Sequence, residues 1–167
     1  TAIGYGSLTT AQTASGSVAI GLDAGGTITT GNRNIAIGYD ALNGAATTGD
    51  NNVAIGVSAG DALTSGKNNV AIGKDAFTRA AAANEIIAIG NNAAGQNTVT
   101  TGADGTVAIG FFALGDLSSG ANNVAIGYEA LRAEDANSEN TAVGYQALKT
   151  QNGADGNTVV GFRAGLD

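Results

Sequence analysis

One short phrase recurs ten times along the chain and constrains its fold more than any other feature. It reads Asn-Ile-Ala-Ile-Gly-Tyr at residues 34–39 and returns almost unchanged at 52–56, 69–73 and 123–128. The glycine of each copy marks the repeat, and successive glycines lie 17, 17, 18, 17, 17, 20, 17, 17 and 17 residues apart: Gly4, Gly21, Gly38, Gly56, Gly73, Gly90, Gly110, Gly127, Gly144 and Gly161. A fixed period of this length is typical of repeat architectures. We therefore expect one repeat domain over residues 1–167, built from about ten stacked units.

The three residues before each glycine have the composition and spacing of a short β-strand. The position directly before the glycine is Ile or Val in all ten copies, and the position between the two apolar columns is Ala in nine. β-Branched residues at two-residue spacing predict a strand, and the glycine predicts a corner that a Cβ would obstruct. The predicted fold class is all-β: a parallel β-roll, or β-solenoid, of about ten 17-residue turns.

The residues after each glycine form the second half of the repeat. An aromatic or apolar side chain usually follows the glycine, as expected if like rings stack on successive turns. Ala stands three residues after the glycine in nine copies, commonly followed by Leu. We interpret this half-turn as a strand or tight extended chain, and a single helical turn is the alternative. The longer units have one extra residue before Gly56 and three before Gly110, and these insertions are predicted to lie outside, on loops.

A column of asparagines stands four residues before the corner. Such a column can form hydrogen bonds along the stack and tolerates turn geometry. It consists of Asn34, Asn52, Asn69, Asn123, Asn140 and Asn157. All 21 charged residues avoid this column, the strand positions and the corner, so we expect the charges to mark the solvent side.

Which strand face points inward stays open at this level. Strand residues alternate between faces, so the Ala column points away from the Val and Ile columns. With Val and Ile inside, a single chain would be self-sufficient. With Ala inside, the roll would be thin, and its apolar outer face would far exceed the ~400 Å² patch that a soluble monomer tolerates. A homo-oligomer would then cover that face. The uniform alanine favours the thin roll.

Tandem Asn-Val-Ala-Ile-Gly units resemble the head repeats of trimeric autotransporter adhesins, the YadA-like family, and the similar repeats of phage tail-fibre proteins. The resemblance covers essentially the whole chain, although the period of 17 residues is longer than the shorter repeat of that family. It implies a left-handed roll and a parallel homotrimer whose axis is lined by the Val and Ile columns: Val18, Ile20, Ile35, Ile37, Val53, Ile55, Val70, Ile72, Ile87, Ile89, Val107, Ile109, Val124, Ile126 and Val143.

Composition excludes several classes of function. The chain has no Cys and no His, which excludes zinc sites of the usual kind and the common nucleophile dyads. Seven basic and 14 acidic residues give a net charge of −7, which argues against a nucleic-acid partner. No apolar run approaches the ~18 residues of a membrane helix, so no membrane insertion is expected. Because the first residue already lies inside a repeat, we interpret the segment as part of a longer fibre chain.

Local motifs offer little chemistry. Residues 60–68 approach a phosphate-binding loop, but the glycine spacing is one residue too long and Asn68 replaces the expected Ser or Thr. Gly4-Tyr5-Gly6 lacks the third glycine of a dinucleotide site. We interpret the carboxylate pair Glu134 and Asp135 as part of a solvated loop rather than as a chemical site. Gly-Ala-Asp-Gly occurs at 102–105 and 153–156, but one carboxylate per loop cannot supply the six to eight oxygens that Ca²⁺ requires.

These observations predict a non-enzymatic structural or attachment segment of an extracellular trimeric fibre, on a virion tail or a bacterial surface, without catalytic residues, cofactor or metal. Its partners would be its own copies and a host-surface receptor or glycan. The main alternative is a monomeric β-solenoid that binds ice or glycans. The Thr-x-Thr segments 27–29 and 98–100 are isolated rather than columnar, which weighs against ice, and the aromatic column is interpreted as packing between turns more readily than as a sugar-binding strip. A third reading is a scaffold attached to a catalytic domain elsewhere in the chain.

Overall fold

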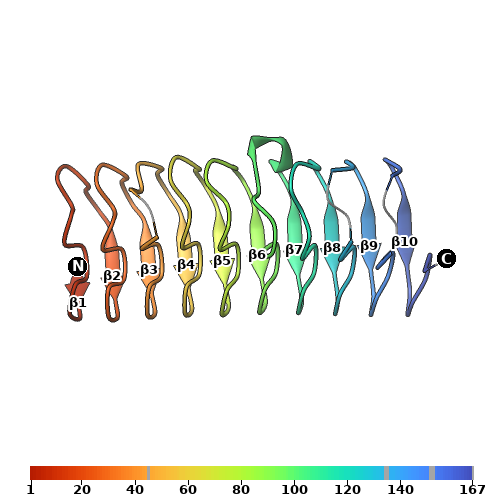
Figure 1. The fold of residues 1–167 in the computed structure, drawn as a ribbon, viewed down its shortest axis with the longest axis horizontal. Coiled ribbons are helices and arrows are strands. Elements are labelled where there is room, and N and C mark those ends of the chain that lie inside the picture. Colours follow the sequence, from red (N-terminus) through yellow and green to blue (C-terminus); the bar gives the residue numbers. More distant parts are fainter. Residues whose placement is uncertain (45, 134–135, 151–152, 167) are drawn as a thin grey trace.

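The structure is a computed structural model that describes residues 1–44, 46–133, 136–150 and 153–166. Its strands form one ten-stranded sheet in which each strand pairs in parallel with the next along the chain (Figure 1). They are β1 (Ala2–Ile3), β2 (Val18–Ile20), β3 (Ile35–Ile37), β4 (Val53–Ile55), β5 (Val70–Ile72), β6 (Ile87–Ile89), β7 (Val107–Ile109), β8 (Val124–Ile126), β9 (Thr141–Val143) and β10 (Thr158–Val160). One strand per repeat, stacked in sequence order, is a β-solenoid, so the predicted fold class is confirmed.

The register between strands places like residues on top of one another. Ala19 pairs with Ala36, and Ile20 pairs with Ile37. The longer units keep the same register, since Ile89 still pairs with Ile109 across the largest spacing. Their extra residues are therefore absorbed by the connections and leave the sheet undisturbed.

The alanine face of the sheet points into the solenoid. The middle alanines of the strands, from Ala19 to Ala142, are at most 2% exposed, and the second alanine column, from Ala24 to Ala147, is fully buried. Two walls of small side chains can approach each other closely and still fill the interior, so the roll is thin. Of the two arrangements that the sequence leaves open, the structure has Ala inside and the Val and Ile columns outside.

Larger core side chains fill the rest of the interior and alternate with small ones. A Cβ built on Gly60 would lie 3.2 Å from Cδ2 of Leu42 on the preceding turn, and one on Gly25 would lie 3.3 Å from Cδ2 of Leu8. The glycines thus leave room for the leucines of neighbouring turns. This accounts for the irregular alternation of large and small residues at that position of the repeat.

The corner glycines are required by both conformation and space. Their φ angles lie between +126° and +139°, a region that residues with a side chain rarely adopt. A Cβ on Gly38 would lie 2.5 Å from the carbonyl oxygen of Gly56, and one on Gly144 would lie 2.2 Å from that of Gly161. Because each corner sits directly on the next, every turn needs glycine at this point.

The half-turn after the corner differs from the extended chain that we predict from the sequence. It is a tight turn without a strand, and its second and fourth residues after the glycine adopt left-handed backbone conformations, as in Asp40 (φ 53°) and Leu42 (φ 51°). The N–H of Leu42 still donates to the oxygen of Ala59 on the next turn, at 3.1 Å. Backbone pairing between turns and burial of Leu42 together offset the cost of a conformation unfavourable for leucine.

The connections lie along the edge opposite the corners (Figure 1). The three extra residues of the longest unit include a short 3-10 helix, η1 (Thr101–Ala103), whose Thr101 and Gly102 are exposed while Ala103 is buried. The single extra residue before Gly56 falls within 43–46, where Gly44 and Ala46 are exposed. Residue 45 lies outside the described residues.

Candidate functional site

The most extensive surface feature is the outer face of the sheet. Its Val and Ile side chains are half-exposed on nearly every turn, and Ile20, Ile87 and Ile126 expose 37–38% of their surface. Each of these side chains lies over the same column of the neighbouring turns, and the alternation of the strand turns it away from the core. The columns carry no charged residue. They form a continuous apolar strip along the sheet, and the residues predicted to line a trimer axis all lie on it.

An aromatic and apolar edge borders this strip directly after the corner. In the C-terminal half, the rings of Phe111, Tyr128, Tyr145 and Phe162 form a stack with centroid separations of 5.0–5.2 Å and interplanar angles of 8–13°. In the N-terminal half the column consists of Tyr5, Leu22, Tyr39 and Val57, which expose 42–84% of their surface. The apolar surface therefore extends around the corner in both halves of the chain and is interrupted between them at Lys74 and Asn91.

The ring stack is poorly suited to bind sugars. An aromatic ring contributes to sugar binding through its face, yet both faces of Tyr128 and Tyr145 are covered by neighbouring rings. What remains exposed, about 41% of Tyr128 and 43% of Tyr145, is the ring edge. This geometry agrees with packing between turns, the interpretation favoured by the sequence.

The asparagine column lies directly before six of the strands, and all of its members but Asn157 are buried. Asn34 and Asn52 are at most 1% exposed. The side-chain oxygen of Asn34 accepts from the N–H of Asn52 at 2.8 Å, and its amide nitrogen donates to the oxygen of Gly49 at 2.8 Å. The other members, Asn69, Asn123, Asn140 and Asn157, also form hydrogen bonds along the stack. These asparagines satisfy backbone groups at the turn and present no surface to a ligand.

A second polar ladder lies two residues earlier, on the outer rim of the connections. The carboxylate of Asp50 accepts from the N–H of Asn32 at 2.7 Å, and that of Asp104 accepts from the N–H of Asn84 at 2.7 Å. The bond from the Asn32 backbone holds the pKa of Asp50 below its ordinary value. The carboxylate of Asp155 likewise accepts from Ser138. Both Gly-Ala-Asp-Gly segments thus use their carboxylates for backbone hydrogen bonds.

Glu129 departs from the expectation that charges mark the solvent side. It is only 5% exposed, and its carboxylate bonds to Arg132, to Nζ of Lys149 at 2.6 Å and to Nε2 of Gln146 at 2.7 Å. Burial raises its pKa, but the bonds from Lys149, Gln146 and Arg132 outweigh burial, so the pKa lies below its ordinary value. The guanidinium of Arg132 also lies 4.7 Å from the centroid of the Phe112 ring. The sequence shows no sign of this cluster, because its members come from two successive turns.

We expect Glu129→Gln to lower the free energy of unfolding at pH 7 by about 2 kcal/mol, less than the 3–5 kcal/mol of a fully buried broken pair. The reason is that Arg132 and Lys149 keep 33% and 29% of their side chains exposed and can rehydrate. Because the folded pKa of Glu129 lies below 4.5, its contribution is present above that pH and is lost as the pH falls through the folded value. Urea unfolding at pH 7 and at successively lower pH tests this: the difference between the variant and the wild type should shrink as the pH falls through the folded pKa. The matched control is Glu139→Gln on an exposed loop, for which a change within about 0.5 kcal/mol is expected.

A polar groove of about 530 Å³ opens on the wall that follows the corner. It spans the turns after β4 to β7 and is lined on one side by Ser58, Asp61, Asp75, Thr78 and Arg79 and on the other by Asn92, Gly95, Gln96, Asn97 and Asp116. Partial burial, together with the charges of Asp40 and Asp75, raises the pKa of Asp61 above its ordinary value. Sequence reasoning does not find this groove, and the only signal for it is the loss of the repeat pattern in these turns.

The remaining motifs have structural positions. Residues 60–68 run from the turn after β4 through the connection to β5, with Leu63 buried in the core. Gly4-Tyr5-Gly6 is a corner and the turn that follows it. Glu134 and Asp135 lie outside the described residues. Among the residues that the structure describes, no group of three or more acidic side chains is placed to hold a metal ion, and no helix is long and apolar enough to span a membrane.

Comparison of the chain with protein-family models, with curated proteins and with solved structures finds no match.

Proposed function

We propose that this chain is a structural and attachment segment of an extracellular fibre in which three parallel copies, each wound as a left-handed roll, share one axis. The observation that carries the proposal is the uncharged, half-exposed strip of Val and Ile on the outer face of the sheet. A strip of this length is too large for a soluble monomer to leave in water. The resemblance to adhesin-head and tail-fibre repeats supports an extracellular location on a virion tail or a bacterial surface.

Further copies of the same chain are the partners that best fit the Val and Ile strip. The strip repeats at the strand spacing, so a parallel copy in register meets the same side chains at every turn. Copies arranged around one axis close on themselves, so each covers the apolar face of the next and no face is left over. The absence of charge from the columns also avoids like-charge contacts between identical copies. In this assembly the fibre acts as a rigid spacer and needs no catalytic group, and its exposed walls are available to a host receptor.

The solution mass tests the proposed assembly most directly. We expect light scattering on a size-exclusion column to give three times the chain mass of 16.2 kDa. Small-angle scattering should show a rod with the length of one chain rather than of three joined end to end. A monomer that stays soluble at high concentration, or a dimer, would contradict the trimer.

A monomeric ice-binding solenoid is the competing proposal, and no surface feature favours it. Its expected Thr array is missing: Ile28 and Val99, the central residues of the two Thr-x-Thr segments, are buried on separate turns. The hydroxyl of Thr27 donates to the oxygen of Leu42 and is therefore engaged within the protein. Thermal hysteresis should accordingly be absent, and a measurable freezing-point gap would revive this alternative.

A further inference from the structure

The polar groove between Asp61 and Asp116 lies where the repeat is least regular. The position directly after the corner glycine is aromatic or apolar on the other turns, but it is Lys74 and Asn91 on two successive turns. The next connection carries the longest insertion, which contains η1. Gln96 and Asn97 from this same lengthened unit line the groove. In a rod whose other turns are nearly alike, a ligand can be bound at one defined place only where the turns differ.

One turn of the groove requires a residue without a side chain. The position five residues after the corner glycine carries Asp61 and Thr78 on two turns but Gly95 on the third. A Cβ on Gly95 would lie 2.5 Å from the carbonyl oxygen of Asp75, so the packing excludes a larger residue there. The groove crosses three turn spacings, about 14 Å in all, and its volume of about 530 Å³ falls in the range of ligand sites, roughly 300–1,000 Å³.

The lining defines the chemistry of a ligand. It consists almost entirely of carboxylates, amides and hydroxyls, which suits neither an apolar ligand nor a lipid chain. Several of these side chains have no protein partner within the described part of the molecule: Ser58, Asp61, Gln96 and Asp116. The three carboxylates outnumber the two cations beside them. The guanidinium of Arg79 donates to the backbone oxygen of Gln96 at 2.8 Å, and Nζ of Lys74 lies 3.4 Å from the carboxylate of Asp75. The groove therefore repels anions and offers many hydrogen bonds to an uncharged polyol.

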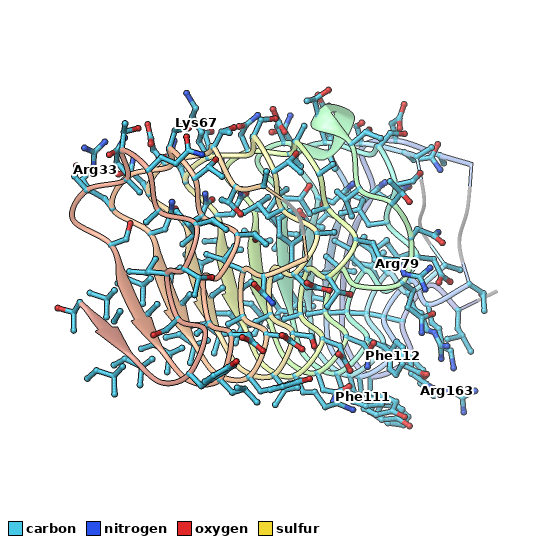
Figure 2. The ribbon with its side chains drawn as sticks, turned by 60° about the vertical axis from the view of Figure 1, so that its left-hand side comes forward. Arg33, Lys67, Arg79, Phe111, Phe112 and Arg163 are labelled. Atoms are coloured by element: carbon cyan, nitrogen blue, oxygen red, sulfur yellow. The ribbon has the colours of Figure 1, made fainter. Side chains whose placement is uncertain are left out.

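We propose that this groove binds a short, uncharged oligosaccharide, with carboxylates and amides that bond to the sugar hydroxyls. The carboxylates accept hydrogen bonds, and each amide both accepts and donates them, which matches the paired hydroxyls of a sugar ring. The groove follows the corner, whereas the apolar strip lies on the sheet before it, and Figure 2 shows Arg79 on the wall away from the strands. The site therefore does not include the Val and Ile strip that carries the proposed trimer.

An array of immobilised oligosaccharides that includes neutral, sialylated and sulfated chains tests the proposal. We expect binding to neutral chains and none to sialylated or sulfated ones, because of the carboxylate excess. The neutral chain that binds best is then titrated into ¹⁵N-labelled protein. Asp61→Asn and Asp116→Ala should each weaken binding at least tenfold, with the amide shifts confined to the groove.

Asp23→Ala is the control for loss of a carboxylate outside the groove. Asp23 occupies the same repeat position as the groove residue Asp75 but lies three turns away, so binding should change less than twofold. Circular dichroism melting confirms that each variant is folded. The proposal is overturned if no neutral oligosaccharide binds at millimolar concentration, if sulfated chains are preferred, or if Asp23→Ala has the same effect as Asp116→Ala. A titration in which Ca²⁺ alone shifts the groove amides while no sugar binds would also overturn it and make the groove a cation site.

Discussion

Replacing Gly73 with alanine is expected to destabilise the solenoid by about 3 kcal/mol, a fall of roughly 10 °C in melting temperature for a chain of this size. Gly73 has a φ angle of +126°, so alanine would be forced into a region that residues with a side chain rarely adopt. The new Cβ would also lie 2.7 Å from the carbonyl carbon and oxygen of Gly90. Neither group can move without shifting the next corner, because the corners are stacked. Thermal unfolding followed by circular dichroism measures the effect.

Gly156→Asn is the control for this prediction. Gly156 also has a positive φ, +73°, but no atom lies within 4 Å of a Cβ built on it. Asn51 and Asn68 occupy the same position of the repeat, each at φ 60°, so asparagine fits there. We expect its melting temperature to stay close to that of the wild type. If Gly73→Ala also melts like the wild type, close stacking of the corners is not what makes glycine necessary.

Ile72→Asp is expected to leave the turn folded and to abolish the proposed assembly. Ile72 is half-exposed on the outer face of the sheet and points away from the alanine interior, so a single chain can hydrate the new carboxylate. In the trimer, three carboxylates would face one axis without a partner, at a cost of about 3 kcal/mol or more per chain. Light scattering should therefore give the single-chain mass, while the circular dichroism spectrum remains that of a β-solenoid.

The control at this position is Ile72→Val. Valine already occurs in the column of Ile72, at Val143 and Val160. The assembly should therefore keep its mass and lose little stability. Unchanged mass and melting behaviour in Ile72→Asp would show that this column does not lie in an interface. Loss of the β-solenoid spectrum in Ile72→Asp would instead show that the column stabilises the single chain.

Much of the fold can be predicted from the sequence because the same pattern of strand and corner residues occurs ten times. The strand bounds follow from the Val-Ala-Ile columns, and the corners follow from the glycines. The second half of each turn is harder to predict: Leu42 and its equivalents look like residues of a strand or helix, yet they adopt left-handed conformations. Propensity fails there because hydrogen bonds to the next turn and burial outweigh the local preference of leucine.

The candidate sites were less accessible to sequence reasoning. Glu129 resembles any loop carboxylate until the structure places Arg132, Gln146 and Lys149 around it. The groove is lined by residues from four successive turns, and no single turn contains the arrangement. Such sites arise from contacts between turns, and a repeat pattern describes only what the turns have in common.

The stacking of the turns, the strand register, the corner positions and the solenoid class follow from the repeat pattern, since each depends on a spacing that recurs along the chain. Which face of the strands points inward follows from the packing of the folded chain. A two-residue alternation shows which side chains share a face, but here both faces are apolar, so hydrophobicity cannot distinguish them. The close approach of Ala19 and its equivalents to the second alanine column resolves the question, because only side chains of that size fit between two walls so near to each other.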